Sequence, residues 1–188
     1  MYRLNNDVHL GMADYYWGMS PEKIHTVLGS CISVTIWNPV KKSGGMCHFL
    51  LPRSRAYDKG ESDARYCEDS VGLLAENISS ENLKPSCYQV KIFGGAAMFE
   101  ESMSRVGESN IRCAEEMLCS HGFVIAARHV GGSSSRHIIF ELETGDVWVK
   151  TNKGILIPES EMDAGEDMID TSGLRSSCVN RPMGVVYG

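Results

Sequence analysis

The chain has 188 residues, 43% of them hydrophobic and 22% charged, which suits one globular domain with its own hydrophobic core. Its formal net charge of −6 argues against a broad nucleic-acid-binding face, because phosphate binding requires clustered lysines and arginines. No apolar run reaches the length of a membrane span, and residues 1–7 contain no apolar signal sequence. We therefore expect a cytoplasmic protein without membrane insertion.

The hydrophobic pattern along the chain predicts strands in pairs with helices between them. Apolar spacing places strands at 26–37 and 44–51, a polar loop at 53–62, a helix at 63–80 and a strand at 88–93. A second helix at 109–119, a strand at 123–128 and a hairpin of strands 137–142 and 146–150 follow. This succession is typical of an α+β domain.

The composition changes near residue 158. Six acidic residues lie between Glu159 and Asp170 with no basic residue among them. We therefore expect one domain at residues 1–157 and an acidic tail at 158–188. The tail is expected to be partly disordered, or docked at its end through residues 179–187.

The cysteines do not predict a disulfide framework or a metal site. There are seven, an odd number, and a reducing cytosol disfavours disulfides. Cys113, Cys119 and His121 come nearest to a metal cluster, but their spacing matches no common zinc motif. We expect no metal, and we expect most of the cysteines to be small buried hydrophobic residues.

A predicted hairpin brings a cysteine and a histidine together. The residues from Asn38 to Lys41 are typical of a type I turn, with proline in its second position. If this turn forms the whole loop, Cys31 lies directly opposite His48, and the two Cβ atoms are about 5 Å apart on one face. A slip of one residue would place the two side chains on opposite faces of the sheet.

Such a pair has a chemical use, because an imidazole can take the proton of a thiol and lower its pKa. Gly29 permits a sharp backbone bend, after which the amides of Ser30 and Cys31 could point at a developing oxyanion. The Thr26 hydroxyl could accept a hydrogen bond from the second imidazole nitrogen and fix its tautomer. The pattern alone favours the simpler interpretation, which is two core residues that face each other and an ordinary β-branched strand residue at position 26.

The same residues resemble the signature of the CheD family of chemoreceptor glutamine deamidases. That signature is a threonine, then Leu-Gly-Ser-Cys, and later Gly-Gly-x-x-His-x-x-Leu-Pro, which stand here as Thr26, 28–31 and 44–52. Similar segments at 11–14, 64–66, 91–99, 107–110 and 130–132, together with Arg136, extend the resemblance from residue 8 to residue 150. The departures are His129 for an acidic residue, Ser135 for a glycine and Ser109 for a basic residue, and they bear on partner contacts more than on the chemistry.

The resemblance implies a β-sandwich-like layered α+β domain with helices packed on the outside. It implies a protein-glutamine glutaminase that converts selected glutamines of methyl-accepting chemotaxis receptors to glutamate and ammonia, and some members also cleave receptor methyl esters. Cys31 would be the nucleophile, His48 the base and Thr26 the orienting group, with no metal or organic cofactor. Some members bind a CheC-type phosphatase.

A glutamine on a long helical receptor requires a shallow, open site. Gly44 and Gly45, and likewise Gly94 and Gly95, could clear space for the approaching helix, or they could simply be turn glycines. Two other functions stay open, namely a non-catalytic adaptor that binds the phosphatase or receptor, and a cysteine peptidase or acyltransferase. Residues 131–135 lack the lysine of a phosphate-binding P-loop, which favours a hairpin turn there.

Overall fold

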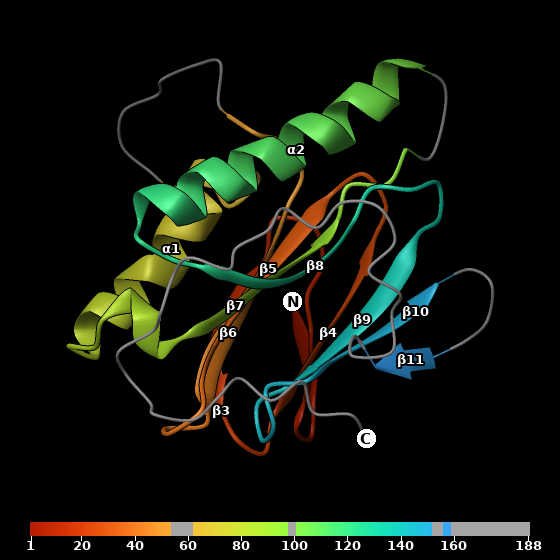
Figure 1. Cartoon of the computed structure of the whole chain (residues 1–188). Helices are drawn as coiled ribbons and strands as arrows, with labels where there is room; N and C mark the ends of the chain where they lie inside the picture. Colours follow the sequence, from red (N-terminus) through yellow and green to blue (C-terminus); the bar gives the residue numbers. More distant parts are fainter. Residues whose placement is uncertain (54–61, 98–100, 152–155, 159–188) are drawn as a thin grey trace.

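The computed structural model describes residues 1–53, 62–97, 101–151 and 156–158, which form two β-sheets and two long helices (Figure 1). In spatial order, the six-stranded sheet contains β1 (Tyr2–Leu4), β2 (Asp7–His9), β4 (Lys23–Leu28), β9 (Arg136–Glu141), β10 (Val147–Thr151) and β11 (Leu156–Pro158). The five-stranded sheet contains β3 (Tyr15–Met19), β6 (Ser43–Phe49), β5 (Ile32–Asn38), β7 (Gln89–Gly94) and β8 (Ile125–Val130). The helices are α1 (Cys67–Ser80) and α2 (Glu101–Ser120), and η1 (Pro85–Cys87) is a short 3-10 turn.

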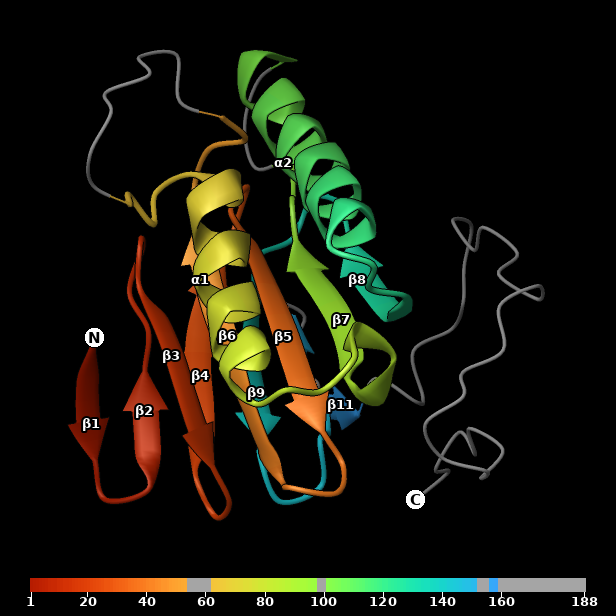
Figure 2. The ribbon, with the colours of Figure 1, turned by 90° about the vertical axis from the view of Figure 1, so that its left-hand side faces the viewer.

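The elements form layers around two hydrophobic cores. Both helices cover one face of the five-stranded sheet, and the six-stranded sheet lies on its other side (Figures 1 and 2). One core joins β5 to the helices through Ile32, Val34, Leu74 and Leu118, among others. The other core joins the two sheets through Val8, Ile24, Met46, Phe93 and Phe140, among others. The predicted layered α+β class is thus confirmed, with both helices on one outer face.

The predicted single strand at 26–37 is wrong, because the chain changes sheets there. β4 ends at Leu28 in one sheet and β5 begins at Ile32 in the other, so residues 29–31 form a crossing. The buried apolar side chains are even-numbered on both sides of it, at Ile24 and Leu28 and then at Ile32, Val34 and Ile36. The period-two alternation therefore runs through the crossing and hides it.

The predicted hairpin register is also wrong, by two residues. Asn38 pairs with Ser43 and His48 pairs with Ser33, so the loop is 39–42 rather than 38–41. Asn38 stays in the strand while its Oδ1 accepts hydrogen bonds from the amides of Val40 and Lys41, each at 2.9 Å. A shift of two preserves side-chain direction, so His48 keeps the face that the prediction gave it.

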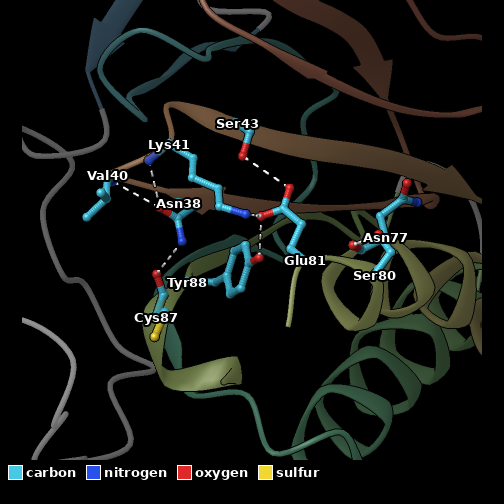
Figure 3. A network of polar contacts seen from close by, with 9 residues as sticks. All are labelled: Asn38, Val40, Lys41, Ser43, Asn77, Ser80, Glu81, Cys87 and Tyr88. Carbon is cyan, nitrogen blue, oxygen red and sulfur yellow. Dashed lines mark hydrogen bonds and ion pairs between the residues drawn. The ribbon is translucent and has the colours of Figure 1, made fainter. Parts of the chain in front are cut away.

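Polar contacts hold the closed end of this hairpin (Figure 3). The Lys41 ammonium lies 3.0 Å from the carboxylate of Glu81, which caps the end of α1. The Tyr88 hydroxyl donates to the same carboxylate at 2.8 Å, and the Asn38 amide donates to the Cys87 carbonyl at 3.4 Å. These contacts tie the turn to α1 and to η1, and thereby stabilise the observed register.

The other elements follow the sequence prediction with shifted ends. The predicted helix at 63–80 begins at Cys67, and the predicted hairpin at 137–150 is confirmed as β9 and β10. The predicted helix at 109–119 begins earlier, at Glu101, and includes Gly107, where a Cβ atom would lie 2.5 Å from the Gly95 carbonyl oxygen. Glycine at this position is explained by close packing rather than by a helix end.

Two predictions concern segments that the structure describes only in part. The acidic tail lies outside the described residues, apart from Pro158 at the end of β11. Within the described ranges, no helix has the length and apolarity needed to cross a membrane.

Candidate active site

Three structural elements bring the predicted catalytic residues to one place. Thr26 lies on β4 of the six-stranded sheet, His48 lies on β6 of the five-stranded sheet, and Cys31 ends the crossing between β4 and β5. The Thr26 Oγ1 and the His48 Nδ1 are 2.8 Å apart, across the space between the sheets. Cys31 comes two residues before Ser33, the partner of His48, and directly before the first paired residue of β5. It packs against the core between the sheets.

The hydrogen bonds of Thr26 determine the tautomer of His48. The Thr26 hydroxyl has one hydrogen, and it donates this hydrogen to the Leu10 carbonyl oxygen at 2.9 Å, because a carbonyl can only accept. Its oxygen must then accept from His48, which requires the proton of the neutral imidazole to be on Nδ1. The lone pair is consequently on Nε2, where a base is needed.

Burial keeps both members of the pair neutral. It lowers the pKa of His48 to about 4, although the nearby Asp14 carboxylate opposes the shift. Burial also raises the pKa of the Cys31 thiol. The expected lowering of the thiol pKa is therefore wrong, and the resting pair at neutral pH is a thiol beside a neutral imidazole. A nucleophilic thiolate then has to form by proton transfer during attack.

The backbone around His48 is held from the N-terminal side of the chain. The Asp14 carbonyl accepts the His48 amide at 2.9 Å, and the His48 carbonyl accepts the Ala13 amide at 2.8 Å. The segment at 11–14, which carried part of the sequence resemblance, thus pairs with the end of β6 that bears the imidazole.

The predicted oxyanion loop is fixed through its carbonyl groups. The Gly29 carbonyl accepts the Ala96 amide at 2.8 Å, and the Cys31 carbonyl accepts the Gly95 amide at 2.9 Å. Gly94 has a φ of +115°, and a Cβ atom there would lie 2.0 Å from the Cys31 carbonyl oxygen. The end of β7 therefore fits against the crossing only because residue 94 is a glycine.

The predicted substrate-approach glycines are all buried, so they do not clear space at the surface. Gly44 and Gly45 lie at the opposite end of β6 from His48, where Cβ atoms would lie 2.3 Å from the Ile36 carbonyl oxygen and 2.6 Å from the Trp17 ring. The prediction for this pair is wrong, and close packing explains both residues. Gly94 and Gly95 do lie beside the site, where they contact the crossing and α2.

The sequence analysis gave no role to Arg136, which is buried beside the site. Its guanidinium donates to the carbonyl oxygens of Gly94 at 2.8 Å, His129 at 2.6 Å, Gly131 at 2.5 Å and Ser134 at 3.3 Å. Burial lowers its pKa to about 10, so it remains a cation at neutral pH. Residues 131–135 thus turn carbonyl groups toward a buried cation, an arrangement that does not suit a phosphate. The predicted hairpin turn there is also wrong, because the segment connects β8 of the five-stranded sheet to β9 of the six-stranded sheet.

Asn110 of α2 is the other residue whose role was missed. It is fully buried, and its side-chain amide contacts both the crossing and the segment after His48. The signal available in the sequence was a polar residue inside a helical segment, and that signal does not identify a partner 80 residues away.

A neighbouring surface cavity of about 280 Å³, lined by Arg53, Arg105 and Cys113 among others, does not include Cys31 or His48.

Comparison with known proteins adds a family to this geometry. The family model described as CheD chemotactic sensory transduction matches residues 50–151, a range that begins just after His48. Three relatives are each named "Probable chemoreceptor glutamine deamidase". The one from Dechloromonas aromatica is 32% identical over 152 residues, which cover 79% of this chain and 89% of the relative. The one from Pseudomonas savastanoi is 34% identical over 149 residues, covering 77% and 84%. The one from Chromobacterium violaceum is 36% identical over 151 residues, covering 78% of each. The chain belongs to the CheD family.

Proposed function

We propose that this chain is a protein-glutamine glutaminase that hydrolyses the side-chain amides of selected glutamines in methyl-accepting chemotaxis receptors. The names of its relatives support the substrate class. The hydrogen bond between Thr26 and His48 supports the chemistry, because it leaves Nε2 free as a base on the face that Cys31 shares. The reaction takes place in the cytoplasm, on a sandwich-like arrangement of the two sheets.

The first half of the reaction forms a thioester. The Nε2 atom of His48 takes the thiol proton of Cys31 as the sulfur attacks the Cδ atom of the glutamine. The amides of Ser30 and Cys31 donate to the resulting oxyanion. The imidazolium then gives its proton to the departing nitrogen, so that ammonia leaves and the thioester remains. Burial disfavours the imidazolium, which therefore exists only while the oxyanion is present beside it.

The second half of the reaction releases glutamate. His48 takes a proton from water as its oxygen attacks the thioester carbonyl, and a second oxyanion forms in the same place. The carbon–sulfur bond then breaks, the product leaves as a carboxylic acid that releases its proton to water to become glutamate, and the thiol of Cys31 regains its proton from His48. Neither half uses a metal or an organic cofactor. A receptor methyl ester would pass through the same thioester, with methanol in place of ammonia.

The test is mass spectrometry of a purified receptor cytoplasmic fragment after incubation with the protein, beside a Cys31→Ala variant. The expected result is conversion of glutamine to glutamate at discrete sites by the wild type and none by the variant. Cys119→Ala is the matched control, because Cys119 is a free and exposed cysteine on α2, and it should convert glutamine at the wild-type rate. Conversion by Cys31→Ala would refute Cys31 as the nucleophile, whereas no conversion by the wild type on several receptors would support the non-catalytic adaptor instead.

A CheC-type phosphatase is the second partner that we propose, on the basis of the family alone. The proposal predicts a stable complex between purified wild-type protein and the phosphatase, measured by size-exclusion chromatography. Because this contact does not require the thiol, Cys31→Ala is expected to form the same complex.

A further inference from the structure

The Asn110 side chain contacts the backbone on both sides of the proposed active site. Its Nδ2 donates to the Leu50 carbonyl oxygen at 2.7 Å and to the Ser30 carbonyl oxygen at 3.1 Å. Both neighbours are acceptors only, so the nitrogen end of the amide must face them. The Oδ1 atom is buried without a partner in the described part of the chain. The donor end alone therefore holds this side chain in place.

The contact with Ser30 fixes the direction of the Cys31 amide. The Ser30 carbonyl and the Cys31 N–H belong to one trans peptide bond, and in such a bond the two groups point in opposite directions. When Asn110 holds the carbonyl against α2, the N–H points away from α2. Within the described ranges, this N–H has no acceptor beyond its own sulfur atom, so it is available to a substrate oxygen.

The contact with Leu50 links the same side chain to the strand that carries the base. Leu50 follows His48 by two residues, just beyond the end of β6. One amide thus joins α2, the crossing that ends at the nucleophile, and the strand end that bears the imidazole. A change at Asn110 would alter the relation between these two backbone segments without touching either reacting side chain.

We propose that Asn110 is a positioning residue that orients the Cys31 amide as an oxyanion donor and holds the nucleophile loop to the strand of the base. The inference rests on the proposed deamidase function. It extends that function to a helix that contributes no reacting group. It also assigns a role to a fully buried side chain of α2.

Asn110→Asp is the informative variant, because it keeps the shape of the side chain and removes both N–H donors. At neutral pH we expect kcat for deamidation to fall about 100-fold with little change in KM, the size of effect seen when one oxyanion donor is lost. As the pH falls below neutral, the buried carboxyl, whose pKa is raised by burial, should take up a proton and regain one O–H donor. The neutral base survives there, since the pKa of His48 is about 4. Partial recovery of kcat in acid is therefore expected, and loss of packing alone would not produce it.

Two controls separate positioning from structure. Asn110→Leu has no donor at any pH and should show the same fall in kcat without recovery in acid. Asn77→Asp makes the same chemical change on α1, where the amide donates to the Leu73 carbonyl at 2.8 Å, and should leave kcat unchanged. The rate of alkylation of Cys31 by iodoacetamide should stay within about twofold of wild type in all three variants, because alkylation develops no oxyanion.

Each outcome supports or overturns the inference. Wild-type kcat in Asn110→Leu would overturn it, and so would alkylation that slows as much as deamidation does, since that would indicate a disturbed loop. If the wild type deamidates no receptor glutamine, the proposed function fails and this inference fails with it. If the wild type is active and Asn110→Asp shows no recovery in acid, only this inference fails.

Discussion

Replacing Thr26 by valine removes the hydroxyl that determines the tautomer of His48 and preserves the shape of the side chain. In the native protein this hydroxyl accepts from Nδ1 of His48 at 2.8 Å and donates to the Leu10 carbonyl at 2.9 Å. In Thr26→Val both partners remain buried and lose their hydrogen bond. Nothing then holds the imidazole proton on Nδ1, and the tautomer with the proton on Nε2 has no lone pair facing the thiol.

The size of the effect follows from these two lost hydrogen bonds. Each buried group left without a partner costs about 1–3 kcal/mol, so we expect the free energy of unfolding to fall by about 2–6 kcal/mol. The tautomer with the proton on Nδ1 loses a similar 1–3 kcal/mol relative to its alternative. Because about 1.4 kcal/mol corresponds to a factor of ten, kcat/KM should fall by about 10- to 100-fold.

Urea denaturation and turnover of a receptor fragment measure the two effects separately. Thr26→Ser retains the hydroxyl and is expected to keep most of kcat/KM. Thr35→Val makes the same change at a buried position of β5 and should leave kcat/KM of the folded protein at the wild-type value. The reasoning is refuted if Thr26→Val retains wild-type kcat/KM, or if Thr26→Ser is as defective as Thr26→Val.

Four further predictions concern the base, the nucleophile loop and the hairpin turn. Because burial lowers the pKa of His48 to about 4, kcat/KM should stay level as the pH falls through 6.5 and decline only near pH 4, and a midpoint near 6.5 in the pH–rate profile would contradict this. Because of the same shift, His48 binds a proton between pH 6.5 and about 4 in the unfolded chain but not in the folded protein. The stability that His48 contributes above pH 6.5 is therefore lost as the pH falls from 6.5 to about 4. Over this range the unfolding free energy of His48→Asn should fall less steeply than that of the wild type. Gly94→Ala places a Cβ atom 2.0 Å from the Cys31 carbonyl oxygen at a φ of +115°, and should lower the free energy of unfolding by about 2–4 kcal/mol and slow the alkylation of Cys31. Gly72→Ala, where a Cβ atom meets nothing within 4 Å, should be neutral or stabilising. Equal effects of the two substitutions would be evidence against the close approach at Gly94. Asn38→Ala removes two hydrogen bonds to turn amides and should lower the urea midpoint by an amount equivalent to about 1–2 kcal/mol without changing kcat, and a loss of kcat would show that the turn acts on the site.

Local patterns were sufficient to predict the types of most elements, whereas the residues of the proposed triad came from the resemblance to the family signature. Apolar spacing identified both helices and the β9–β10 hairpin, because each buries one periodic face. The crossing at 29–31 could not be seen, since the buried apolar residues of β4 and β5 are all even-numbered and the apolar alternation never changes phase. The register of the hairpin depended on whether Asn38 remained in the strand, and that depended on its contacts with Cys87 and the turn amides.

The residues that the sequence analysis missed act over long distances along the chain. Asn110 contacts carbonyl groups 60 and 80 residues earlier, and Arg136 binds the Gly94 carbonyl 42 residues earlier. A buried asparagine or arginine has no periodic signature, and its partners are backbone atoms that every residue type provides. Only the packing of α2 and β9 against the crossing reveals what these two side chains hold.

The hydrogen-bond chain from His48 through Thr26 ends at the Leu10 carbonyl, an atom that neither binds nor releases a proton in water. The proton on Nδ1 of the imidazole therefore cannot be passed on, and the ring cannot transfer a proton from Nδ1 to Nε2 through this chain. Every proton must arrive and depart at Nε2. The hydrogen that the sulfur surrenders is thus the one that the departing ammonia carries away, unless bulk water replaces it during the lifetime of the imidazolium. Such an imidazole exchanges protons through Nε2 alone in both halves of the reaction, and it needs no change of tautomer between turnovers.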